Sequence, residues 1–218
     1  MSVSERMTLA MRMARAAERS AAERVARGGV RKDSTVSAPA MHSQVPARPG
    51  EHLTLMPGQL HFGGHAATLR TLLGSCLAVT LWHPERCLGG MCHFLLPSRQ
   101  RKGDEPLDGR YGDEALEALV NMLRAARSAP AEFHAHLYGG ADTMPEGGAL
   151  RFNVGARNIE QGFNLVDRYG FQIQGVDVGE DVPRTVVLTL ATGEVSMRRG
   201  DGAAPQHHLQ ASLSRSKA

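Results

Sequence analysis

Aromatic residues make up only 5% of the 218 residues, with one Trp, three Tyr and six Phe. Apolar runs are also short, since the longest, such as residues 77–82, fall far below the ~20 residues that a membrane-spanning helix needs. The sequence therefore excludes a core built on large rings and a transmembrane helix, and we expect a soluble protein. Its 24 glycines predict short elements with many turns and a core of Leu, Val, Ala and Met.

Cysteine is scarce as well, with only Cys76, Cys87 and Cys92 in the chain. An odd number of cysteines leaves at least one thiol outside any intramolecular disulfide. The N-terminus has no apolar secretory segment, so we expect a reducing compartment, the cytoplasm.

The sequence gives little support for a metal centre or a carboxylate pair. The candidate metal ligands are His83, Cys87, Cys92, His93, His134 and His136. They contain no Cys-x-x-Cys pair, and Cys92 and His93 alternate to opposite faces of a strand, so their spacing fits no compact zinc site. Asp177, Glu180 and Asp181 lie in a glycine-containing turn, where a solvated or turn-capping role is expected. We therefore expect neither a metal nor an organic cofactor.

Charge is unevenly distributed along the chain. The net charge of +3 combines a balance of +5 in residues 1–50 with a balance of −2 in the remaining 168 residues. The longer part has no dense stripe of Lys and Arg, which argues against nucleic-acid binding.

The basic N-terminal region predicts an extension rather than a core. Residues 4–25 carry Arg12, Arg15, Arg19 and Arg24 at roughly helical spacing, which permits either a solvated, partly helical segment or a docking helix with a basic face. Residues 28–50 are rich in Gly, Ser, Pro and Ala and indicate a linker. We expect a disordered or partly helical extension over 1–50, one folded domain over 51–200 and a disordered tail over 201–218.

Apolar periodicity predicts the elements of that domain. The first helix is expected over Tyr111–Arg127, where Asp113 and Glu114 favour the first turn. The second is expected over Val154–Tyr169 and ends at Gly170. Strands are expected over 68–73, 77–82, 89–96, 133–138, 171–178, 185–190 and 194–198. This order predicts a single α/β (α+β) domain, a layered sandwich of mixed β-sheet with two main helices.

The corner Gly74-Ser75-Cys76 lies between two predicted strands, and His93 follows Cys76 by seventeen residues. A cysteine at a sharp corner can expose its sulfur beside backbone N–H groups, and a nearby histidine can take the thiol proton to give a nucleophilic thiolate. The spacing alone is a weak signal, and a small buried cysteine with a hydrogen-bonded strand histidine is the commoner arrangement. Both interpretations stay open on the residues alone.

Longer stretches carry a family resemblance. They read Thr-Leu-Leu-Gly-Ser-Cys-Leu-Ala-Val-Thr-Leu at 71–81 and Gly-Gly-Met-Cys-His-Phe-Leu-Leu-Pro at 89–97. Later blocks follow at Arg110–Asp113, Tyr138–Ala141, Gly155–Asn158, Asp177–Gly179 with Arg184, and Thr192–Val195. Together, over about residues 60–200, they resemble the chemoreceptor glutamine deamidase (CheD) family of bacterial chemotaxis. The order of the blocks favours the catalytic interpretation of Cys76.

The resemblance implies a Cys/His hydrolase, a protein-glutamine glutaminase that converts particular receptor glutamines to glutamates without a cofactor. Cys76 matches the nucleophile and His93 the general base. The third catalytic member of the family is a threonine shortly before the cysteine, which assigns that role to Thr71. Ser75 or a backbone carbonyl is the alternative for holding the imidazole ring.

The resemblance also implies partners. Methyl-accepting chemotaxis receptors are the expected protein substrate, with no nucleic acid and no insertion into the membrane, and a CheC-type phosphatase is a further candidate partner. The alternative function is a non-catalytic interaction module that binds such a phosphatase. A pure adaptor need keep neither Cys76 nor His93, so their presence favours the enzyme.

Overall fold

The computed structural model describes residues 44–64, 66, 68–142, 154–200 and 206–207 of the chain. The predicted basic extension before residue 44 and most of the predicted C-terminal tail lie outside these ranges. None of the helices within them is long and apolar enough to cross a membrane.

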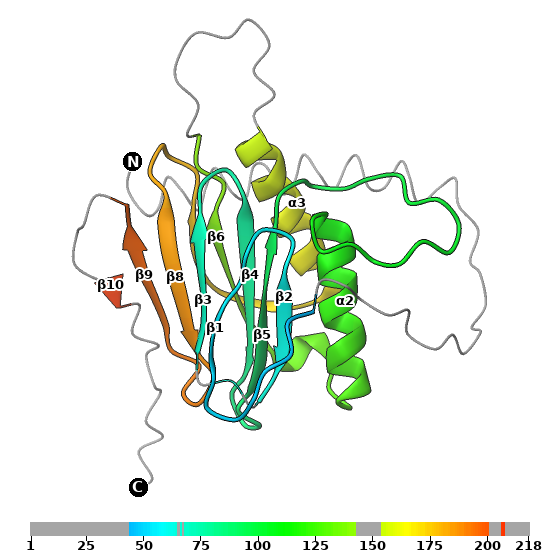
Figure 1. Cartoon of the computed structure of the whole chain (residues 1–218), viewed down its shortest axis with the longest axis vertical. Coiled ribbons are helices and arrows are strands. Elements are labelled where there is room, and N and C mark those ends of the chain that lie inside the picture. Colours follow the sequence, from blue (N-terminus) through cyan, green and yellow to red (C-terminus); the bar gives the residue numbers. More distant parts are fainter. Residues whose placement is uncertain (1–43, 65, 67, 143–153, 201–205, 208–218) are drawn as a thin grey trace, which may run out of the picture.

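The fold has three layers (Figure 1). Its elements are β1 (His52–Thr54), β2 (Leu60–Gly63), β3 (Thr68–Leu73), β4 (Leu77–His83), β5 (Leu88–Phe94), α2 (Gly112–Ala125), a 3-10 turn (Pro130–Glu132), β6 (His134–Gly139), α3 (Val154–Tyr169), β7 (Gln172–Val178), β8 (Arg184–Thr189), β9 (Val195–Arg199) and β10 (Gln206–His207). The first sheet has the strand order β2-β5-β4-β6-β7 and the second the order β1-β3-β8-β9-β10. The sheets pack face to face, and both helices cover the outer face of the first sheet, which confirms the predicted layered α/β fold.

Most predicted elements are present. β3 and α3 have the predicted bounds, and α2 begins and ends within two residues of its prediction. Apolar periodicity does not predict β1, β2 and β10, which contain only three, four and two residues. Such short strands give no run of alternating residues, and their pairing with distant strands forms them.

β4 is the central strand of the first sheet, and all seven of its residues are buried. Leu77, Val79 and Leu81 pack towards the helices, whereas Ala78 and Trp82 pack between the sheets. A strand that is buried on both faces appears in a sequence as a nearly continuous apolar run, which is the pattern at 77–82, where Thr80 is the one polar residue. The alternation also fixes which side chains of its neighbours face the second sheet.

The corner Gly74-Ser75-Cys76 carries the chain from one sheet to the other. β3 pairs with β1 and β8 in the second sheet, and β4 pairs with β5 and β6 in the first. The two strands that flank the corner therefore share no ladder. Cys76 consequently lies at the edge of the space between the two sheets, next to the inter-sheet core.

Ordered contacts begin before the domain boundary predicted at residue 51. Val45 N donates a hydrogen bond to Leu60 O at 2.8 Å, and the His61 ring bonds Val45 O at 2.6 Å. Val45 and Ala47 also pack against the inter-sheet core. Residues 44–50 thus contact the domain, although their composition resembles that of a linker.

Candidate active site

Cys76 is a free, half-buried cysteine immediately before β4. Ala78, two residues later, faces the second sheet, and Cys76 packs against the same inter-sheet core. Ala78 pairs directly with His93 on β5. Cys76 and His93 therefore occupy diagonal positions on one face of the sheet, a separation that longer side chains can bridge.

His93 is held firmly in the space between the sheets. Its backbone N donates to Gln59 O at 3.0 Å, and its carbonyl accepts from Gly58 N at 2.7 Å. Its side chain is 1% exposed. Its neighbour Cys92 faces the helices instead, as the predicted alternation requires.

Thr71 reaches the His93 ring from the opposite sheet. Its hydroxyl donates to Leu55 O at 2.8 Å, and its Oγ1 lies 2.8 Å from His93 Nδ1. Because a hydroxyl has a single hydrogen, Oγ1 must accept from Nδ1–H, which leaves a lone pair on Nε2. Nε2 is buried and has no hydrogen-bond partner among the described residues. The lone pair on Nε2 of the neutral ring is therefore available to accept a proton.

Burial sets the protonation of both groups. It lowers the pKa of His93 to about 4, although the carbonyl of Leu55 opposes this in part. Burial also raises the pKa of the Cys76 thiol, against a smaller opposing effect of its own backbone N–H. Both directions favour a neutral thiol beside a neutral imidazole over the ion pair that the sequence analysis considered.

The carbonyls of the corner are held in place by the segment that joins β6 to α3 and by α3 itself. Gly74 O accepts from Ala141 N at 2.9 Å, and Cys76 O accepts from Gly140 N at 2.7 Å. Ser75 O accepts from the side chain of Asn158 at 3.0 Å. Gly139 allows this close approach, because a Cβ there would lie 2.3 Å from Cys76 O and its φ is +109°.

Other predicted ligands do not gather into a metal site. Cys92 is fully buried in the helix-facing core, where burial raises its pKa to about 12, and Cys87 is exposed in the turn before β5. Within the described ranges, no group of three His, Cys, Asp or Glu side chains could hold a metal ion. Of the two candidate holders of the His93 ring, it is Thr71 and not Ser75 whose side chain bonds the ring among the described residues.

The solvated or turn-capping role predicted for Asp177 is wrong. Asp177 lies within β7, and its carboxylate accepts from Arg184 Nε and, at 2.9 Å, from Arg199 Nη2. Burial alone would raise the pKa of Asp177, but the hydrogen bonds from Arg199 and Arg184 outweigh it and hold the pKa below its usual value. Arg184 is fully buried and pairs with Leu73, the last residue before the corner. These ion pairs tie the two sheets together near the site.

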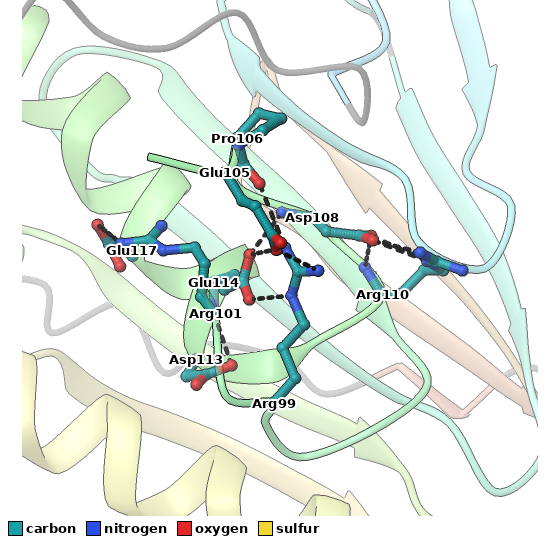
Figure 2. A network of polar contacts seen from close by, with 9 residues as sticks. All are labelled: Arg99, Arg101, Glu105, Pro106, Asp108, Arg110, Asp113, Glu114 and Glu117. Carbon is teal, nitrogen blue, oxygen red and sulfur yellow. Dashed lines mark hydrogen bonds and ion pairs between the residues drawn. The ribbon is translucent and has the colours of Figure 1, made fainter. Parts of the chain in front are cut away.

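A polar network fastens the loop that follows β5 (Figure 2). Glu114 is 3% exposed and accepts from Arg99 Nε at 2.7 Å and from Asp108 N at 2.8 Å. The N–H groups of Leu95 and Leu96 both donate to Arg110 O. The sequence analysis assigned Glu114 only to the helix dipole, and nothing in its local pattern indicates this buried role. The network fixes Leu95, two residues beyond His93.

The low pKa of His93 predicts an acid-dependent loss of stability. The unfolded chain takes up a proton on this ring near pH 6.5, and the folded chain does so only near pH 4. Because the unfolded state binds more protons in this window, the free energy of unfolding falls as the pH drops from about 6.5 to about 4, by up to about 3 kcal/mol. Urea unfolding of the wild type and of His93→Ala at pH 7 and pH 4.5 measures this effect. Equal pH slopes in the two proteins would contradict it.

Comparison with known proteins identifies the family to which the chain is similar. Residues 95–199 match the family described as CheD chemotactic sensory transduction, a segment that begins after His93. A probable chemoreceptor glutamine deamidase CheD of Pseudomonas syringae pv. tomato is 41% identical over 145 residues, which cover 66% of this chain and 86% of that relative. The probable chemoreceptor glutamine deamidase CheD 1 of Chromobacterium violaceum is 40% identical over 163 residues, covering 74% of this chain and 84% of that relative.

The fold comparison is weaker. The solved structure of Bacillus licheniformis hypothetical protein YfiH aligns with 62% of this chain and 63% of its own, at 14% identity and a TM-score of 0.34. This likeness is too low to say anything about the site. The sequence identity to relatives that are covered over most of their length is decisive, and the chain belongs to the CheD family.

Proposed function

We propose that this chain is a chemoreceptor glutamine deamidase of the cytoplasm, which hydrolyses glutamine side chains to glutamate through a thioester on Cys76. One observation carries the chemistry. The hydrogen bond from His93 Nδ1 to Thr71 leaves the buried Nε2 as a free base, on the residue that pairs with Ala78, two positions after Cys76. The names of the relatives, probable chemoreceptor glutamine deamidases, support the substrate.

The first half of the reaction forms the thioester. Cys76 Sγ attacks the side-chain carboxamide carbon while its proton moves to His93 Nε2. The opposed pKa directions of the two groups favour this concerted transfer over a preformed thiolate. The C–N bond then breaks, and the proton on Nε2 passes to the departing ammonia. Thr71 keeps the ring oriented by accepting from Nδ1–H throughout.

The negative oxygen that forms at the carboxamide needs hydrogen-bond donors. The backbone N–H groups of Ser75 and Cys76 are the candidates, because no other described residue accepts a hydrogen bond from either. Their partner carbonyls are already held by Ala141 and Asn158. Donors fixed before the reaction stabilise a developing oxyanion without reorganisation.

The second half of the reaction hydrolyses the thioester. Neutral His93 takes a proton from water through Nε2 while the water oxygen attacks the thioester carbon. The C–S bond breaks, the proton returns to the sulfur, and the products are a glutamate side chain and the free enzyme. Each turnover replaces a neutral amide with a carboxylate, so the receptor gains one negative charge.

Mass spectrometry tests the proposal. A receptor cytoplasmic fragment is incubated with the full chain, digested and searched for glutamines that gain about one dalton, with Cys76→Ala as the matched control. We expect modified glutamines with the wild type alone. Equal modification by the variant, or none by either protein on receptor fragments of the same organism, would refute the proposal.

The same assay decides between the enzyme and a non-catalytic module. A module that binds a CheC-type phosphatase requires neither a free base on His93 nor a thiol at Cys76. The described side chains favour the enzyme, because Thr71, His93 and Cys76 are all present and Thr71 holds the ring. Binding to a CheC-type phosphatase stays a prediction, and it is compatible with catalysis.

A further inference from the structure

Asn158 is a buried side chain that no step above uses chemically. It lies in the second turn of α3 and is 0% exposed. Its Nδ2 donates to Ser75 O at 3.0 Å and to Leu95 O at 2.8 Å. An amide nitrogen has two hydrogens, so both are committed, while its Oδ1 is buried with no partner among the described residues. The hydrogen bonds of this buried side chain are therefore the two that its Nδ2 donates.

The bond to Ser75 O determines where the Cys76 amide points. A trans peptide unit is planar, and its C=O and N–H point in opposite directions. When Asn158 holds Ser75 O towards α3, the N–H of Cys76 must point away from α3. Gly74 O, held by Ala141 N, orients the N–H of Ser75 in the same way. The two proposed oxyanion donors are therefore set by the bonds behind them.

Asn158 holds its carbonyl of the corner through a side-chain hydrogen bond. The carbonyls of Gly74 and Cys76 are held by backbone N–H groups, which substitution leaves in place. The carbonyl of Ser75 depends on one side-chain amide, which substitution removes. Without it, the Ser75–Cys76 peptide can turn and bring its carbonyl oxygen towards the oxyanion, which it would repel.

The second bond of Asn158 reaches the strand of the general base. Leu95 follows His93 by two residues, and its carbonyl shares the same Nδ2 with the nucleophile corner. One amide group therefore ties the Cys76 corner to the end of β5. His93 itself is held separately, by Gln59 O, Gly58 N and the Thr71 hydroxyl, so losing this link leaves the base in place.

We propose that Asn158 is a positioning residue that orients the Cys76 backbone N–H as an oxyanion donor. The inference rests on the proposed deamidase function. It assigns to Asn158 a role in kcat rather than in substrate binding, since the bonds it makes are directed away from the substrate.

The test compares Asn158→Ala with Asn164→Ala, a half-buried asparagine further along the same helix. For Asn158→Ala we expect kcat to fall roughly 10²-fold to 10³-fold with KM nearly unchanged, the loss typical of one oxyanion donor. Asn164→Ala should keep near wild-type kcat. Asn158→Leu, which has a similar volume and donates no hydrogen bond, serves if the alanine variant does not fold.

Alkylation of Cys76 by iodoacetamide distinguishes a role of Asn158 in orienting the oxyanion donor from a general loss of the structure of the site. This reaction needs the thiol and its base but no oxyanion donor. In a Cys87→Ser background, Asn158→Ala should therefore alkylate within about twofold of the Asn158 parent. A parallel loss of alkylation and deamidation would overturn the proposal in favour of a merely structural role.

A crystal structure of the variant tests the orientation itself, even if the wild type proves inactive as a deamidase. We expect the Ser75–Cys76 peptide plane to turn when Asn158 is removed. An unchanged plane would overturn the inference and leave the proposed function untouched. An inactive wild type would instead refute the proposed function.

Discussion

Cys76→Ala should abolish deamidation, with kcat/KM reduced by roughly 10⁴-fold or more, while the protein stays folded. The thiol supplies the bond that carries the acyl group, and an alanine methyl group cannot form it. Because Cys76 is half-buried at the edge of the core, losing its sulfur leaves no large internal cavity. Turnover of a receptor fragment measures the loss of activity, and circular dichroism measures whether the variant is folded.

The other two cysteines provide controls. Cys87→Ala should retain full activity, because this side chain is exposed and remote from His93. Cys92→Ala should retain most activity but lose stability, because Cys92 is fully buried between β5 and the helices. Normal turnover by Cys76→Ala would exclude the thioester mechanism.

His93→Ala should lower kcat/KM by roughly 10³-fold to 10⁴-fold, because both halves of the reaction pass a proton through Nε2. Thr71→Val should lose less, roughly 10-fold to 10²-fold, since it removes the acceptor that orients the ring and the bond to Leu55 O but leaves the base itself in place. Thr71→Ser keeps a hydroxyl at this position and should recover most of the loss. If Thr71→Val and Thr71→Ser are equally active, the hydroxyl does not orient His93.

The pH profile gives an independent measurement on the wild type. The base must be neutral, and burial lowers the pKa of His93 to about 4. We therefore expect kcat/KM to stay level from pH 8 to about pH 5 and to fall only near pH 4. A decline centred near pH 6.5, the ordinary pKa of histidine, would show that the ring is hydrated in the free enzyme.

The sequence was informative where local pattern and final structure agree. The apolar run at 77–82 predicts β4, because a strand buried on both faces is apolar along its whole length. The apolar residues at 154–169 recur at helical spacing and predict α3, because this helix buries one face. The corner at Cys76 and its spacing to His93 predict a candidate pair, and the family resemblance favours the catalytic interpretation and adds Thr71. Their order along the chain gives no sign that Thr71 meets His93 from the opposite sheet.

Long-range contacts account for what the sequence did not reveal. Asn158 has an ordinary place in an amphipathic helix, and only the corner at residues 74–76 gives it a role. Asp177 lies two residues before Gly179, which suggests a turn, yet two arginines from the second sheet form ion pairs with it. Residues 44–50 resemble a linker in composition, but their backbone finds partners on β2.

The second sheet joins the two ends of the domain, and this has a consequence for synthesis on the ribosome. Thr68 pairs with Thr189, so β3 lacks one of its neighbours until nearly the whole domain has emerged. Pairings between residues so distant in sequence form slowly, because a long loop must close first. Thr71 belongs to that sheet and His93 to the other, so the hydrogen bond between them forms late. A nascent chain therefore lacks this orienting bond until its last strands have joined, and we expect a chain that ends before β8 to be less active than the complete domain.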